Sequence, residues 1–277
     1  MDQIRIRELQ FQQLKIMDEI HRICIENGLK YYMIGGSALG AVRHKGFIPW
    51  DVDIDIAMPR SDYEKFLQIV SRVIDDKFLC HDYKRDKIYS SPHAIVEMKN
   101  SILKYSFTDL NPIIGPQGIY VDILPLDIVS SNLEEQALHA KKLNRIKWLK
   151  TLKLSKIYPN NTFVQKITKH LIRIMLFPIS WYYLNDKQQK TAQMYSHVEN
   201  PTLCCSTLSH YKYKKLTMPI SYYGKPTLMK FEDRMYFCPE NVEKYLCHIF
   251  GDYQKLPPIQ DRLESMNSII QAEWQNE

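Results

Sequence analysis

The feature that most constrains this chain is segment 31–60, where a short apolar run ends at two glycines and an alternating acidic run follows. The apolar run predicts a strand that stops at Gly35 and Gly36, and Ser37 is a residue type that caps helices. Glycines let a backbone approach a ligand closely, and a helix N-terminus presents N–H groups and a positive dipole end. We therefore expect Gly35, Gly36 and Ser37 to bind an anion such as phosphate.

Three acids, Asp51, Asp53 and Asp55, then alternate with branched residues. In a strand this period puts the carboxylates on one face, where like charges need a cation or strong solvation. One interpretation is a solvated strand edge whose acids prevent aggregation. The other is a site for Mg²⁺, which prefers hard oxygen ligands. The Gly-Gly-Ser turn upstream favours the second, because phosphoryl transfer requires a phosphate cradle and a metal site together.

The same residues carry a family resemblance. Gly35-Gly36-Ser37 followed by Asp53-Ile-Asp55 is similar to the nucleotidyltransferase fold, and the longer string from Ser37 to Arg60 resembles the LicD family of phosphotransferases. Fukutin-related proteins are distant relatives of that family. The resemblance covers roughly residues 15–130 and 220–262, and it departs at Val52, where many members have an acid.

The resemblance implies an α+β (α/β) fold, with a nucleotidyltransferase-like mixed sheet flanked by helices. It implies that Asp53 and Asp55 hold Mg²⁺ or Mn²⁺. Asp122, in the strand-like run 119–124, would be the third carboxylate, either a metal ligand or the general base. An acid between branched residues costs desolvation unless it has a partner, which supports this assignment. Asp127, a few residues later, is expected to cap a turn.

Other residues near the turn are candidates for substrate binding. Arg43, His44 and Lys45 could clamp a diphosphate, since arginine suits bidentate phosphate contacts. Trp50 could stack on a base or on a cationic choline head, or could be a core residue. Asp51 completes this predicted set of substrate-binding residues.

By resemblance, the donor is CDP-choline or a similar CDP-alcohol, and the acceptor is a glycan such as teichoic acid, capsule or lipopolysaccharide, which could be lipid-linked. The transferred group could instead be phosphoethanolamine, ribitol phosphate or glycerol phosphate. Nucleotidyl transfer and a non-catalytic binding module are the rival functions. No nucleic acid is expected as a partner, because no recognised motif supports one.

The charge of the chain is uneven. Segment 141–190 contains twelve Lys or Arg and a single acid, about +11, within a chain of 277 residues and net charge +6. We expect three parts: a catalytic core at 1–130, a helical basic insertion at 131–220, and a C-terminal segment at 221–277 that packs back on the core.

Within the insertion, segment 162–184 predicts a basic amphipathic helix with terminal aromatics. It could lie on an anionic membrane surface, or it could pack its apolar stripe on the core. Both interpretations stay open here.

Other patterns predict helices and strands along the chain. The helices are expected at 4–27, at 61–75 with a Ser61–Glu64 capping box, at 134–155 and at 241–250; the strands are expected at 78–81, 94–99 and 204–205.

Six cysteines without a C-x-x-C pair indicate reduced thiols. The charged N-terminus and the lack of a long apolar run predict neither signal peptide nor spanning helix. We therefore expect a cytoplasmic protein that could contact the inner face of the plasma membrane peripherally.

Overall fold

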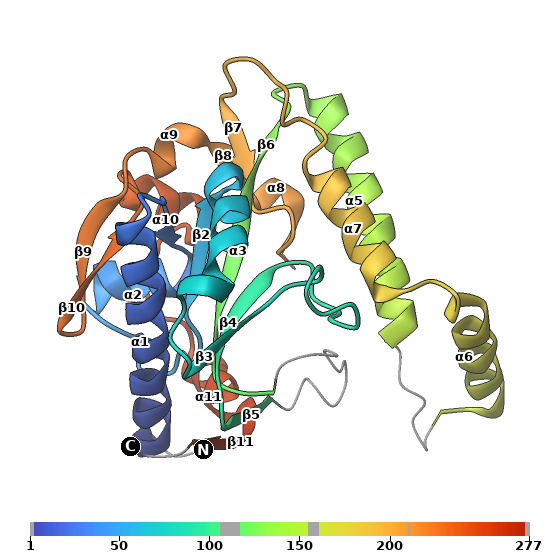
Figure 1. Cartoon of the computed structure of the whole chain (residues 1–277), viewed down its shortest axis with the longest axis horizontal. Helices are drawn as coiled ribbons and strands as arrows, with labels where there is room; N and C mark the ends of the chain where they lie inside the picture. The colour runs from blue at the N-terminus through green and yellow to red at the C-terminus, as the bar shows by residue number, and fades with distance from the viewer. Residues whose placement is uncertain (1–2, 106–116, 155–160, 210, 275–277) are drawn as a thin grey trace.

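A mixed sheet lies at the centre of the computed structural model, which describes residues 3–105, 117–154, 161–209 and 211–274 (Figure 1). Along the sheet the order is β1 (Tyr32–Met33), β2 (Asp55–Pro59), β6 (Tyr120–Val129), β4 (Ala94–Met98) and β3 (Phe78–His81). The C-terminal end of β6 also pairs with β7 (Leu203–Cys205), and β7 in turn pairs with β8 (Thr217–Pro219). β2 and β6 run parallel, whereas the other pairs are antiparallel. The predicted mixed sheet flanked by helices is confirmed.

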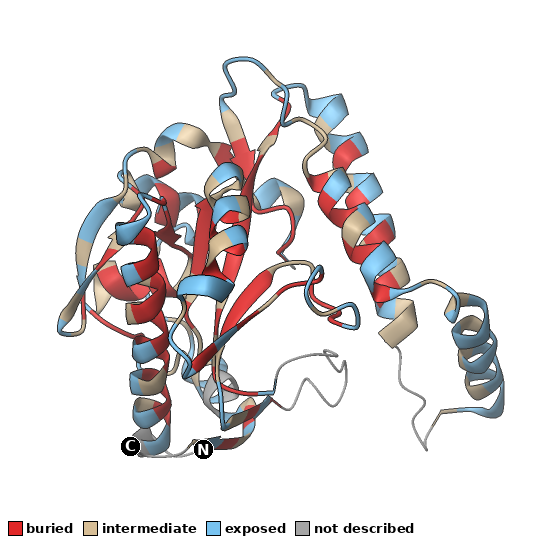
Figure 2. Cartoon of the chain, viewed as in Figure 1, coloured by how far each residue is buried: buried red, intermediate tan, exposed pale blue. Residues whose placement is uncertain are grey.

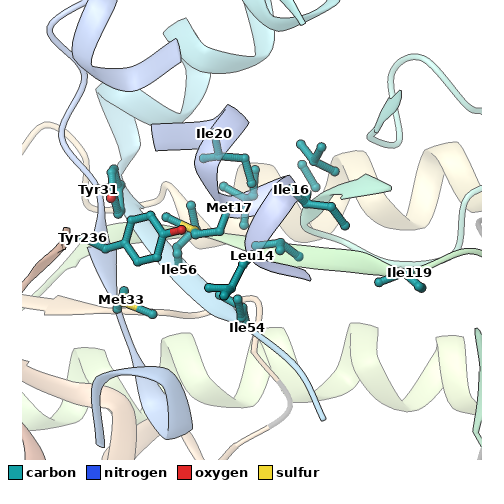
Figure 3. Close-up of a cluster of buried hydrophobic side chains, with 14 of the residues drawn as sticks. Leu14, Ile16, Met17, Ile20, Tyr31, Met33, Ile54, Ile56, Ile119 and Tyr236 are labelled. Carbon is teal, nitrogen blue, oxygen red and sulfur yellow. The ribbon is translucent and has the colours of Figure 1, made fainter. Parts of the chain in front are cut away.

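Helices cover both faces of this sheet. On one face, α1 (Gln3–Glu26) and α3 (Arg60–Val73) bury their apolar stripes in a cluster that includes Ile54 and Ile56 of the acidic run. Figure 3 shows Leu14, Met17 and Ile20 of α1 in this cluster. On the other face, α2 (Gly35–Arg43) and α10 (Val242–Phe250) pack over Ala57 and Leu124. Side chains of successive residues in a strand thus pack in the clusters on opposite faces of the sheet, as expected for a pleated strand.

The helix ends agree only in part with the sequence. α1 stops where predicted: Gly28 has φ +61°, and Leu29 N donates to Cys24 O over 2.9 Å. α3 instead begins at Arg60, after Pro59, and no side chain caps it, so the predicted Ser61–Glu64 capping box is wrong. Glu64 accepts from Arg60 Nη1 at 3.3 Å instead.

The middle of the chain forms three helices. α5 (Leu133–Leu154) and α7 (Trp181–Ala192) pack side by side, and α6 (Phe163–Leu176) lies beyond their far end, away from the sheet (Figure 1). The expected helix end at Ser155 lies outside the described residues. After α7 the chain returns to the central sheet through β7, which confirms a strand at Cys204 and Cys205.

Polar side chains of α7 fasten it to the core. Asn185 Nδ2 donates to Tyr89 O at 2.7 Å, and Gln189 Nε2 donates to Pro92 O at 2.6 Å. Gln189 Oε1 also accepts from Arg60 Nη1 at 2.8 Å. The loop that precedes β4 is therefore held directly by α7.

Asp127 lies inside β6, so the prediction that it caps a turn is wrong. It is 1% exposed, and Arg60 donates to both of its carboxylate oxygens over 2.7 and 2.9 Å. Thr207 Oγ1 donates to the same carboxylate at 2.7 Å. The strand continues past the expected end near Leu124 by pairing with β2 and β7, and the buried carboxylate within it is fully paired.

The remaining elements close the molecule around the sheet. They are α8 (Tyr213–Leu216), α9 (Ile220–Tyr223), the hairpin of β9 (Thr227–Phe231) and β10 (Arg234–Cys238), α11 (Ile259–Asn267), and β11 (Ile269–Trp274), which pairs with β5 (Ser101–Tyr105). Within the described ranges, none of the helices is both long and apolar enough to cross a membrane.

Candidate active site

Four carboxylates gather where β2 begins beside β6. Asp55, the first residue of β2, pairs in register with Asp122 of the parallel strand β6. Asp122 N donates to Ile54 O at 3.1 Å, which fixes the two strands against each other. Asp51 and Asp53 precede the strand rather than lie in it, yet the alternation persists, because Val52 and Ile54 are buried and the acids are half-buried. The predicted separation of acidic and branched faces is confirmed.

The charges of these carboxylates act on one another. Burial, and then the charge of Asp122, raise the pKa of Asp53 to about 6. Burial and the charges of Asp53 and Asp122 raise the pKa of Asp55 well above its ordinary value. The pKa of Asp51 is raised by burial and by Asp53, with which it shares a hydrogen bond. The cluster therefore opposes its own ionisation unless positive charge arrives.

The donor set suits a hard divalent cation, because it consists of carboxylate oxygens. As the side chains stand, however, no three Asp, Glu, His or Cys residues in the described part of the chain converge tightly enough to hold one ion in common. The chemistry of Asp53, Asp55 and Asp122 fits Mg²⁺ or Mn²⁺, and binding would require their side chains to turn toward the ion.

The Gly-Gly-Ser turn lies against these acids. Gly35 opens α2 with φ +55°, and its N–H donates to the Tyr245 hydroxyl at 2.8 Å. A Cβ on Gly36 would lie 2.3 Å from Asp51 Oδ2, so any other residue there would force that carboxylate to move. Because α2 starts at Gly35, Ser37 lies within the helix, and the prediction that it caps the helix is wrong. Its Oγ instead accepts from Asp55 N at 2.9 Å and so fastens β2 to α2.

A cavity of about 910 Å³ opens beside the acids and is within the range of small-molecule sites. Its lining combines glycine and acids from the turn and acidic run with aromatic side chains: Gly36, Asp51, Asp53, Asp55, Trp50, Tyr211, Phe250 and Tyr253. A smaller cavity of about 130 Å³ shares Asp53 and Asp55 and adds Asp122 and His93. The carboxylates thus line both spaces.

The predicted diphosphate clamp is only partly assembled here. Arg43 lines the large cavity, and its Nη1 donates to Tyr253 O at 2.6 Å. His44 and Lys45 are not among the described residues that line it: the His44 ring packs edge-on against Trp50, and Lys45 is exposed. Their binding of phosphate stays a prediction.

Trp50 lines the cavity and also packs against the apolar cluster that contains Ala57 and Leu124. The guanidinium carbon of Arg262 lies 4.9 Å from the centre of its ring, so this face already carries a cation.

Sequence reasoning missed His93. Its Nε2 lies 2.7 Å from Asp122 Oδ1, and its Nδ1 lies 3.2 Å from Ser91 Oγ. No spacing pattern marks it; the signal available was its place directly before the predicted strand at 94–99. Tyr245, which holds Gly35, was missed as a site residue because it is 210 positions away along the chain.

Residues 28–136, which contain the Gly-Gly-Ser turn, the acidic run and Asp122, match the family described as LicD/FKTN/FKRP, nucleotidyltransferase domain. Over this segment the chain is similar to a LicD-type nucleotidyltransferase domain. The resemblance carried by Gly35–Ser37 and Asp53–Asp55 is thereby confirmed.

Similarity extends beyond the LicD-type domain. The chain is 27% identical over 272 residues to the lipopolysaccharide cholinephosphotransferase LicD of Haemophilus influenzae, covering 95% of this chain and 96% of that protein. It is 39% identical over 75 residues to a protein of Rickettsia typhi, covering 27% and 23% of the two chains. It is 49% identical over 35 residues to the human ribitol 5-phosphate transferase FKRP, covering 13% and 7%. These matches support the predicted enzyme class, a phosphotransferase.

Proposed function

We propose that this protein transfers phosphocholine from CDP-choline to a hydroxyl group of a cell-surface glycan precursor, such as a teichoic acid, a capsule or a lipopolysaccharide. The observation that carries the proposal is the register of Asp55 with Asp122, which puts the acids between a large and a small cavity. The match to the Haemophilus cholinephosphotransferase over nearly the whole of both chains supports the choice of transferred group.

The two cavities offer places for two substrates. The large cavity suits the donor, because aromatic side chains such as Tyr211 and Phe250 can contact a base and acids can attract a quaternary ammonium group. Arg43 would bind a phosphate oxygen, as would the N-terminal turn of α2. The small cavity, with Asp122 and His93, suits the acceptor hydroxyl.

In the proposed reaction the acceptor oxygen attacks the phosphorus that carries choline. The new P–O bond forms as the bond to the bridging oxygen of the diphosphate breaks, and CMP leaves. Asp122 takes the proton of the acceptor hydroxyl, or else serves as a third metal ligand. As a base it would contribute about 10²–10⁴-fold to the rate. His93, 2.7 Å away, would be a positioning residue that orients this carboxylate.

A divalent cation completes the proposal. Mg²⁺ or Mn²⁺ held by Asp53 and Asp55, with or without Asp122, would neutralise the charge of the donor diphosphate. The raised pKa values of Asp53 and Asp55 support this assignment, because a bound cation would remove the repulsion that raises them.

A second candidate is transfer of another CDP-linked alcohol phosphate, such as ribitol, glycerol or ethanolamine phosphate. The short match to the ribitol 5-phosphate transferase favours ribitol among these. Nucleotidyl transfer has less support, and a non-catalytic module has least, since all the predicted acids are present and gathered. We further propose that the protein acts in the cytoplasm on its glycan and not on nucleic acid; its six cysteines are free thiols.

The experiment is a comparison of donors. With Mg²⁺ present, thermal unfolding of the protein is followed with CDP-choline, CDP-ethanolamine, CDP-ribitol, CDP-glycerol and CTP, and CMP release is measured with glycan acceptors. We expect CDP-choline to stabilise most and to yield CMP only with an acceptor. A larger effect of CDP-ribitol or another CDP-alcohol would establish the second candidate. Stabilisation by CTP alone with pyrophosphate release would replace both with nucleotidyl transfer.

A further inference from the structure

One face of α6 is apolar, and its side chains are exposed within the part of the chain that the structure describes. Its six exposed apolar residues are Phe163, Val164, Ile167, Leu171, Ile174 and Met175, at 44–77% exposure. At 3.6 residues per turn they fall on one face about a third of the helix wide. None of the residues of α6 is buried, and Figure 2 shows the helix mostly in the exposed colour. The structure therefore does not support packing of this stripe on the core.

The helix has its own reasons to form. Thr162 and Gln165 make a reciprocal capping box: Gln165 N donates to Thr162 Oγ1 at 3.3 Å, and Thr162 N donates to Gln165 Oε1 at 3.0 Å. At the other end, Lys153 of α5 donates to Leu176 O at 2.8 Å. Both ends are thus fixed, and α6 lies at the extremity of the molecule (Figure 1).

The charges beside this face have one sign. α6 contains Lys166, Lys169 and Arg173 and no acid, and no Asp or Glu occurs from Thr162 to Asn185. Phe177, just beyond the helix, is 85% exposed. A basic helix with an exposed apolar face and aromatic residues at its ends complements an anionic lipid surface, in which apolar and charged groups are layered.

We propose that α6 docks this protein on an anionic lipid bilayer, with its apolar face in the headgroup boundary and Arg173 beside the lipid phosphates. The inference does not depend on the proposed transfer reaction, because it rests on α6 alone. It commits to lipid rather than to a protein partner, since the charged residues of α6 are all basic.

The test is co-sedimentation of the full chain with vesicles of phosphatidylcholine alone or with one quarter phosphatidylglycerol. We expect sedimentation with the anionic vesicles at low salt and release as salt rises. The double variant Leu171→Asp/Ile174→Asp should lower the partition coefficient at least about tenfold, and Arg173→Glu should lower it on anionic vesicles only. Unchanged thermal unfolding would show that the variants fold, as expected for exposed positions.

The control is Leu228→Asp, which places one such negative charge at an exposed leucine of β9, 48% exposed and outside α6. It should sediment like the wild type.

The proposal is overturned if the wild type does not bind anionic vesicles at any salt concentration, or if the double variant still binds them fully. It is also overturned if light scattering shows a dimer that the double variant converts to monomers without any vesicle binding, since α6 would then bind a second copy. None of these experiments measures enzyme activity. A negative result would therefore not contradict the proposed transfer reaction.

Discussion

At the scale of residues, the acids were predictable and their partners were not. The even spacing of Asp51, Asp53 and Asp55 predicted a shared face, and the strand around Asp122 predicted a neighbour. His93 was not predictable, because its contact with Asp122 arises only when β4 pairs with β6. Likewise Ser37 was assigned to the wrong role: α2 begins two residues earlier, at Gly35, whose N–H donates to the distant Tyr245 hydroxyl.

Asp53→Asn should abolish turnover and stabilise the metal-free protein above about pH 6. The pKa of Asp53 is about 6 in the folded protein, raised by burial and by Asp122, against about 3.9 in an unfolded chain. When the pKa of a carboxyl is higher in the folded protein than in the unfolded chain, protonation of that carboxyl stabilises the folded state. This stabilisation is complete below about pH 4 and is lost as the pH rises through about 6. Thermal unfolding in EDTA between pH 4 and 8 should therefore show a smaller loss of Tm in the variant than in the wild type.

The control for this variant is Asp76→Asn, which removes one charge at an exposed position outside the cluster. It should behave as the wild type does, including stabilisation by Mg²⁺, whereas Asp53→Asn should gain none. Near-normal turnover of Asp53→Asn in Mg²⁺ would show that the metal assignment is wrong.

Asp122→Asn should slow transfer at least about 100-fold, the usual effect of losing a general base. His93→Gln should lower kcat and leave the KM for the donor unchanged, because His93 acts through Asp122. The double variant should be no slower than Asp122→Asn, since the two residues act as one unit. Additive losses would mean that His93 contributes independently, and loss of Mg²⁺ and donor binding in Asp122→Asn would make Asp122 a third ligand.

At the scale of elements, the sequence periodicity predicted helices in the middle region, but it did not predict the contacts that hold these helices together. The pattern at 134–155 predicted the helix that forms α5. The single helix predicted at 162–184 is wrong in its bounds: α6 ends at Leu176, the chain turns around Pro178, and α7 begins at Trp181. What holds α5 to α7 is partly polar: Lys150 Nζ donates to Asn185 Oδ1 at 2.6 Å and to Gln188 Oε1 at 3.0 Å in the interior. A lysine in a basic run suggests a solvated face, so its burial could not be foreseen.

Lys150 should make the stability of the protein rise with pH above neutrality. Burial, with a smaller effect of Lys147, lowers the pKa of Lys150 to about 7, against about 10.4 in an unfolded chain. Between these values the unfolded chain binds more protons, so the free energy of unfolding increases with pH, by at most about 1.4 kcal/mol per pH unit. Urea denaturation at pH 7, 8 and 9 should show this rise in the wild type and a flatter line in Lys150→Met.

Lys141→Met is the matched variant, since Lys141 lies on the same helix and is exposed. It should keep the wild-type slope. If Lys150→Met keeps that slope as well, the buried lysine is not its source.

At the scale of the whole molecule, the contacts that join the two ends of the chain were beyond sequence patterns. Glu232, at the turn between β9 and β10, binds Arg7 of α1 and accepts from Phe47 N at 2.9 Å. Arg234 donates to Asp18 of α1 at 2.9 Å. Such pairs lie more than 180 positions apart, and neither periodicity nor motif spacing predicts them.

Glu232→Ala should lower the free energy of unfolding by about 1–3 kcal/mol, because Phe47 N and Arg7 each lose an acceptor. Asp233→Ala, one residue away and exposed, serves as its control and should cost less than about 0.5 kcal/mol. Chemical denaturation measures both values. Equal losses in the two variants would show that the Glu232 contacts do not join the ends of the chain in solution.

The long span of these contacts has a consequence for the order in which the site is assembled. Asp55 and Asp122 meet through two strands 67 positions apart, whereas Gly35 meets Tyr245 and Arg43 meets Tyr253 across 210 positions. Closing a long loop costs more entropy and slows folding, so we expect the acids to gather before the cavity wall forms around them. In refolding from urea, the helical signal in circular dichroism should return first and donor binding later. A chain that binds its donor has then finished folding, and a partly folded chain does not bind the donor.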